Sequence, residues 1–152
     1  MLDDVTSRLL LVVTLLAAAS LWFAQRRRSE GRFVGAAPPG GHRAADALSS
    51  ADLGGALGGR ATFVQFSTAT CATCPQVRRT LADLAGRTPG VTHVEISAED
   101  RMDLVRRFAV RRTPTVLLVG PDGLVRARTA GPVTTHEALA TLEAHVPGGR
   151  RA

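Results

Sequence analysis

The sequence predicts an α/β fold, with a central mixed β-sheet flanked by helices and preceded by one apolar N-terminal helix. Three observations lead to this prediction. Short apolar or β-branched runs alternate with helical patterns between residues 61 and 146. The turn sequence Gly-Pro-Asp-Gly at 120–123 joins two of these runs directly, which indicates that part of the sheet is antiparallel. Residues 5–25 are apolar apart from one charge and precede the alternating region.

The composition is that of one compact domain with an appendage. The chain has 152 residues, of which 45% are hydrophobic, so it is long and apolar enough to bury a core. The net charge is +6, and the basic residues are spread along the chain rather than clustered among aromatic residues, which make up only 4%. We therefore expect no nucleic-acid partner.

Residues 1–28 are predicted to form a transmembrane anchor with a basic flank. The apolar run at 5–25 is interrupted only by Arg8 and reaches the 17–25 residues, roughly, that cross a bilayer as a helix. Trp22 lies near one end, where interfacial aromatics are found. A cleaved signal peptide has its basic residues before the apolar core, whereas here Arg26, Arg27 and Arg28 follow it. This order favours an uncleaved anchor.

The same charges predict an orientation in the cell membrane. Arginine-rich flanks remain in the cytoplasm, and four arginines follow the apolar run: Arg26, Arg27, Arg28 and Arg32. We therefore expect a single-pass protein whose C-terminal domain is cytoplasmic. An extracytoplasmic domain is the alternative.

Three further segments follow the anchor. Residues 29–49 are rich in Gly, Ala and Pro and are predicted to be a flexible linker. Residues 50–146 are predicted to form the folded domain, and residues 147–152 a disordered tail. A short helix is expected at 50–57, capped by Ser49 or Ser50, although its glycines weaken it.

The elements of the domain are predicted from hydrophobic spacing and capping residues. Gly86 is expected to end the first long helix, and Thr134 with Glu137 has the spacing of a capping box at the start of the last one. The expected elements are a strand at 61–67, a helix at 74–85, a strand at 91–96, a helix at 101–108, strands at 115–119 and 124–129, and a helix at 134–145.

Cys71 and Cys74 are the only cysteines, and their Cys-x-x-Cys spacing falls where a strand gives way to a helix. Proteins build redox-active dithiols at such junctions. The helix N-terminus favours negative charge, so Cys71 is expected to be the nucleophilic thiolate. Cys74, one helical turn further on, is expected to resolve a mixed disulfide.

Other uses of two cysteines agree less well with the sequence. A zinc site normally needs four ligands, and none of the four histidines (His42, His93, His136 and His145) has suitable spacing, so we predict no metal site. A purely structural disulfide would close a very short loop and constrain little. Two buried, inert cysteines remain the main alternative.

The pattern resembles the thioredoxin family over residues 50–146. The matching segments are Phe63–Phe66, Cys71–Pro75, Val91–Ser97, Val110–Thr115, Gly120–Gly123 and Gly131. The resemblance implies a thioredoxin-like fold and a cis peptide bond before Pro114, beside the dithiol. It also implies that the backbone of Thr113 is free to pair with an extended substrate.

The chain departs from the family's pattern at functional positions. Thr70 stands before the first cysteine, where thioredoxins usually carry tryptophan, so the substrate-binding rim is more polar. Gln65 occupies the place of a buried aspartate and cannot take up a proton, so Glu95 or solvent becomes the candidate base for Cys74. Arg112 could modulate the Cys71 thiolate or be a solvated surface charge.

The residues and the resemblance together predict a membrane-anchored thiol–disulfide oxidoreductase that reduces or exchanges protein disulfides. Its partners would be disulfide-containing proteins and an unidentified electron donor, and the reaction needs no bound cofactor. A non-catalytic thioredoxin-like binding module at the membrane is the first alternative. An outward-facing disulfide oxidant or assembly factor is the second.

Overall fold

The computed structural model describes residues 2–29, 33–35 and 47–147. It divides into two compact units, Met1–Glu30 and Gly31–Ala152, which are considered separately. Most of the segment predicted to be a linker, and residues 148–152 of the predicted tail, lie outside the described residues.

The first unit is one helix, α1, which covers Leu2–Ser29. Its segment Ser7–Gln25 has a mean hydropathy of 1.9 and is long enough to cross a membrane, although a signal sequence near an N-terminus has the same properties. The hydroxyl of Thr14 donates to the Leu10 carbonyl at 2.7 Å, so this polar group is satisfied within the helix. The predicted apolar helix is therefore present as a candidate membrane span.

The second unit is built on a mixed sheet of five strands in the order β1-β5-β4-β2-β3. Strands β2 and β3 are parallel, and the other neighbouring pairs are antiparallel. The strands are β1 Val34–Gly35, β2 Ala61–Ser67, β3 Val91–Ser97, β4 Thr115–Val119 and β5 Val125–Ala130. The predicted mixed sheet is confirmed, and the predicted bounds of β2 and β4 agree with those of the structure.

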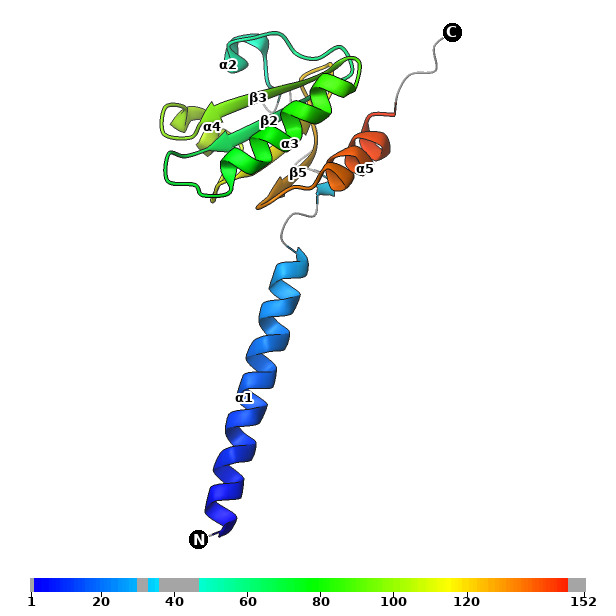
Figure 1. The fold of residues 1–152 in the computed structure, drawn as a ribbon. Helices are drawn as coiled ribbons and strands as arrows, with labels where there is room; N and C mark the ends of the chain where they lie inside the picture. The colour runs from blue at the N-terminus through cyan, green and yellow to red at the C-terminus, as the bar shows by residue number, and fades with distance from the viewer. Residues whose placement is uncertain (1, 30–32, 36–46, 148–152) are drawn as a thin grey trace. The chain divides into compact units, whose positions relative to one another are not determined.

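Helices cover both faces of this sheet (Figure 1), because successive side chains of a strand point to opposite faces. Phe63 packs with residues of α3 (Cys74–Arg87) and α5 (Thr135–His145). Phe66 packs with residues of α2 (Ser50–Leu53) and α4 (Met102–Arg107) on the other face. Strand β2 is consequently buried along its whole length, and its end presents the cysteine pair.

Two local differences from the sequence predictions have simple physical reasons. The expectation that Gly86 ends the helix is wrong, since α3 continues to Arg87 and the chain turns at Gly90, whose φ is +75°. One glycine costs a helix only about 1 kcal/mol relative to alanine, which the buried face of α3 offsets. Val34–Gly35 lies in the range assigned to the linker but pairs with β5, next to Phe33, whose ring contacts Phe63 edge-on.

Candidate functional site

The cysteine pair lies where the buried strand β2 gives way to α3. After Ser67 the chain turns, with the Cys71 amide donating to the Thr68 carbonyl at 3.2 Å, and α3 begins at Cys74. Cys71 therefore lies in the turn before the N-cap residue Thr73, and α3 begins at Cys74, where the sequence predicted the helix to start. It still lies close to the N-terminal end of α3, where the helix dipole favours negative charge.

The two cysteines form a disulfide. The S–S distance is 2.06 Å, the Cα atoms are 5.5 Å apart, and the Cβ–S–S–Cβ dihedral is 84°. Cys74 is only 3% exposed, whereas Cys71 is partly accessible to solvent. The pair is thus close enough to interconvert between bridge and dithiol, and a partner can reach it from the Cys71 side.

The start of α3 leaves a hydroxyl near the accessible sulfur. Thr73 makes no side-chain hydrogen bond to its own helix, and its Oγ1 lies 3.9 Å from the Cys71 Sγ. Pro75 occupies the first turn, where its missing N–H removes no helical hydrogen bond. The first turn of the helix is therefore suited to support charge at Cys71.

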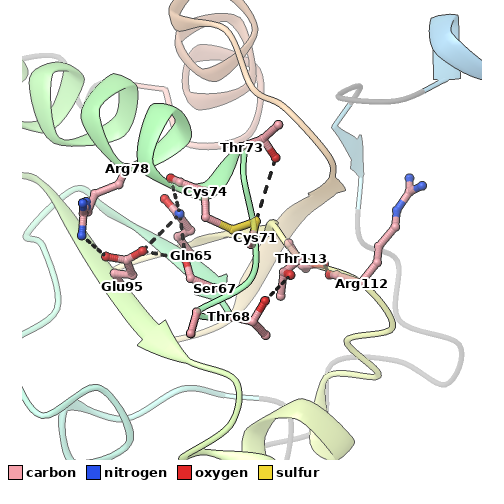
Figure 2. Close-up of a disulfide and its surroundings, with 12 residues drawn as sticks. Gln65, Ser67, Thr68, Cys71, Thr73, Cys74, Arg78, Glu95, Arg112 and Thr113 are labelled. Carbon is pink, nitrogen blue, oxygen red and sulfur yellow. Dashed lines mark hydrogen bonds and ion pairs between the residues drawn. A yellow bond between two sulfur atoms is a disulfide. The ribbon is translucent and has the colours of Figure 1, made fainter.

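A second loop contributes the proline that the family resemblance indicated. The Thr113–Pro114 peptide bond is cis, and Pro114 is buried. The Thr113 hydroxyl lies 3.0 Å from that of Thr68, which ties this loop to the turn before Cys71 (Figure 2). The predicted cis proline is confirmed. Thr70, the expected rim residue, is exposed.

Beneath the disulfide, Gln65 connects the start of α3 to an acidic residue on the neighbouring strand. Gln65 is fully buried, and its Nε2 donates to the Cys74 carbonyl at 3.0 Å and to the Ser67 Oγ at 2.9 Å. Nε2 also lies 3.4 Å from the Glu95 Oε1, and the Ser67 hydroxyl donates to the same oxygen at 2.6 Å. Figure 2 shows this chain of contacts from α3 to β3.

The outer end of the chain is an ion pair. Arg78, one helical turn after Cys74, donates to the Glu95 Oε2 at 3.2 Å. Ser67 and Arg78 had no assigned role in the sequence analysis. The parallel register, which sets Gln65 opposite Glu95, brings them together, and register is not visible in a single sequence.

Two other polar groups complete the surroundings. The guanidinium of Arg112 donates to the Ala130 carbonyl at 3.0 Å and points away from the disulfide in Figure 2. His93 lies on β3 two residues before Glu95, and burial lowers the pKa of its imidazole, although Glu95 partly opposes this. Within the described residues, no group of three or more His, Cys, Asp or Glu side chains could hold a metal ion.

A cleft opens beside the turn, at the carboxyl ends of β2 and β3. Its volume is about 360 Å³, and its lining consists of three hydroxyl side chains, two carboxylates and one alanine: Ser67, Thr68, Ser97, Glu95, Glu99 and Ala69. The cleft gives solvent access to the Glu95 end of the Gln65 chain.

Solved structures of similar shape are thioredoxins. The matches include thioredoxin-2 of the malaria parasite, described as a component of its protein secretion machinery (19% identity, TM-score 0.51). They also include a thioredoxin from Halobacterium salinarum NRC-1 (20%, TM-score 0.53) and chloroplastic thioredoxin z (23%, TM-score 0.53). These matches cover 56%, 57% and 59% of this chain and 82%, 75% and 81% of those chains, respectively.

The chain has the thioredoxin fold. No family model matches the sequence, and no curated protein sequence matches it. The thioredoxin fold, together with a Cys-x-x-Cys pair at the strand-to-helix junction, supports thiol–disulfide oxidoreductase chemistry. At these identities the structural likeness extends to the fold alone.

Proposed function

We propose that this protein is a membrane-anchored thiol–disulfide oxidoreductase that reduces or exchanges disulfides in protein substrates. The observation that carries the proposal is the bridged cysteine pair with unequal exposure, set beside a cis proline in a thioredoxin fold. Cys71 is the nucleophile and Cys74 the resolving cysteine. The apolar helix α1 is the anchor.

The reaction consists of two thiol–disulfide exchanges. The Cys71 thiolate attacks one sulfur of the substrate disulfide, so a Cys71–substrate bond forms, and the other substrate sulfur leaves and takes a proton. The Cys74 thiol then gives its proton to solvent and attacks the Cys71 sulfur, which releases the second substrate thiol. Two electrons pass from the dithiol to the substrate, and a dithiol donor in the cell resets the bridge.

Substrate binding would use the surface next to Cys71. The backbone of Thr113 precedes the cis proline and would pair with an extended substrate segment, while Thr70 forms part of the rim. Because threonine replaces a large aromatic ring at this rim, the contact is more polar, and specificity rests more on backbone pairing.

The test uses the full chain in detergent and a disulfide-bonded protein as substrate. We expect Cys71→Ser to abolish reduction, because no nucleophile remains, and Cys74→Ser to accumulate a mixed disulfide through Cys71, visible as a covalent adduct by mass spectrometry. The double variant serves as the control and should form no adduct.

Retained activity in Cys71→Ser would contradict the proposed roles. If the wild-type protein reduces no disulfide, and Cys71 of the reduced protein resists alkylation at neutral pH, the thioredoxin fold acts instead as a binding module.

A further inference from the structure

The side-chain oxygen of Gln65, the buried amide under the disulfide, receives no hydrogen bond from the described residues. Gln65 Oε1 is among the buried side-chain atoms without a hydrogen-bond partner in the part of the chain that the structure describes, and Gln65 is 0% exposed. A buried acceptor without a hydrogen-bond donor is energetically unfavourable. Because Gln65 contacts Cys74, the cysteine pair is where we look for a donor to this oxygen.

Rotating the Gln65 amide by 180° would not give Oε1 a hydrogen-bond donor without breaking other contacts. Nε2 faces three acceptors: the Cys74 carbonyl, the Glu95 carboxylate and the Ser67 oxygen, whose own hydrogen is given to Glu95. Exchanging Nε2 and Oε1 would set an oxygen against those acceptors. Arg78 holds the other carboxylate oxygen of Glu95 and so helps to fix the arrangement. Oε1 therefore keeps the role of acceptor.

The disulfide has no hydrogen to donate, whereas the reduced pair has. Reduction adds two electrons and two protons to the bridge and gives Cys74 an S–H group. Cys74 is already in contact with Gln65 through its carbonyl and is 3% exposed, so its thiol is held in the same buried region. Reduction thus creates a hydrogen-bond donor on Cys74, the residue whose carbonyl already contacts the Gln65 amide.

We propose that in the reduced protein the Cys74 thiol donates a hydrogen bond to Gln65 Oε1, so that Gln65 stabilises the dithiol relative to the disulfide. The inference rests on the proposed function. Gln65 acts on the reaction through Cys74 and is therefore a positioning residue. Because a glutamine takes up no proton, Gln65 is not the base of the resolving step.

The inference gives Gln65 two consequences for the cycle. The protein becomes a stronger oxidant than it would be without this acceptor, because the equilibrium with an external thiol shifts toward the dithiol. Cys74 also stays protonated until the mixed disulfide has formed, since a hydrogen bond to the neutral form favours that form. The first attack is thereby left to Cys71.

The test measures the redox equilibrium of the full chain against glutathione, in detergent at pH 7. Gln65→Met removes the acceptor and keeps a side chain of similar length. We expect the equilibrium constant to shift toward the disulfide by about fivefold, given that S–H is a weak donor. This shift corresponds to a reduction potential about 20 mV lower.

Thr129→Val is the matched control. The Thr129 Oγ1 is also buried and without a partner among the described residues, and the register places Thr129 opposite Val116, which in turn lies opposite Gln65. This variant removes a buried oxygen without a hydrogen-bond partner from the same sheet, two strands away from Gln65. We expect its redox equilibrium to remain within twofold of wild type.

A spectroscopic measurement does not depend on how Gln65→Met folds. In Cys71→Ala the Cys74 thiol is the only thiol of the chain, so its infrared S–H stretching band can be observed alone. We expect the band at a lower frequency than that of a solvent-free, unbonded thiol. A band at the unbonded frequency would overturn the inference.

The outcomes separate the inference from the proposed function. If Gln65→Met is folded and its redox equilibrium lies within twofold of wild type, hydrogen bonding to Oε1 does not differ between the two redox states. The inference is then overturned, while the oxidoreductase assignment stands. If the wild-type pair does not exchange with glutathione at all, the proposed function itself fails.

Discussion

His93, at the edge of the candidate site, is expected to make folding sensitive to pH. Burial lowers the pKa of its imidazole, the positive charge of Arg78 adds to this effect, and Glu95 opposes it. In the unfolded chain the same group titrates near its ordinary value of 6.5. Below that pH the unfolded state binds more protons than the folded state, so acid favours unfolding.

We therefore predict that the free energy of unfolding falls as the pH is lowered from 7.5 to 5.5, a range above that in which carboxylates titrate. His93→Gln should flatten this dependence, and His136→Gln, at an exposed position, should not. Urea titrations of the full chain in detergent at a series of pH values would measure the free energy of unfolding and its dependence on pH. An unchanged slope in His93→Gln would show that another group is responsible.

Single residues differ in how well the sequence predicts them. Cys71, Cys74 and Pro114 are identified by short local motifs, and the structure brings the dithiol and the cis proline loop together. Ser67 and Arg78 belong to the network only because β2 and β3 pair in one parallel register. A pairing between strands separated by a helix leaves no mark on local spacing, so the sequence did not place either residue in this network.

At the scale of elements, the β4–β5 turn holds the segment that leads into α2. Gly123 has a φ of +79°, and its carbonyl accepts a hydrogen bond from the amide of Leu48 at 2.8 Å. A Cβ atom at Gly123 would lie 2.3 Å from the Leu48 carbonyl oxygen. Leu48 is 1% exposed, so this contact closes one end of the core.

Gly123→Ala is predicted to destabilise the domain by about 2 kcal/mol, because both the positive φ and the close approach oppose a side chain. Gly86→Ala, inside α3 where an added Cβ meets no atom within 4 Å, should instead stabilise it by about 1 kcal/mol. Chemical denaturation of both variants would measure the difference. Equal effects would contradict the role given to the turn.

Most element boundaries follow from capping and turn residues. The capping box of Thr134 and Glu137 is present at the start of α5, and Ser49 with Asp52 forms a second one at α2. The two-residue strand β1 escaped prediction because its sequence, Val34–Gly35, has no alternation to detect. It exists because β5 offers a sheet edge and Phe33 packs on the core.

At the scale of the whole molecule, composition predicts an apolar helix and a separate α/β domain, and both are present. Orientation depends on the membrane and the insertion machinery, so it does not follow from the fold. The excess of arginines after the apolar run remains the argument for a cytoplasmic domain.

We predict that the full chain stays in the membrane pellet after alkaline carbonate extraction. Leu15→Arg places a charge in the middle of the candidate span, which costs about 2.5–3.5 kcal/mol on insertion, and should release much of the protein. Protease treatment of inside-out vesicles should digest the domain if it is cytoplasmic. Protection there and digestion in right-side-out vesicles would establish the opposite orientation.

Under the proposed function, the unequal exposure of the two cysteines would also limit how many client proteins one molecule can hold at a time. A folded client is too large to reach the sulfur of a residue that is 3% exposed, so it must join and depart at Cys71. Only one covalent complex can then exist on each molecule at a time. Different clients would then compete for a single atom, the sulfur of Cys71.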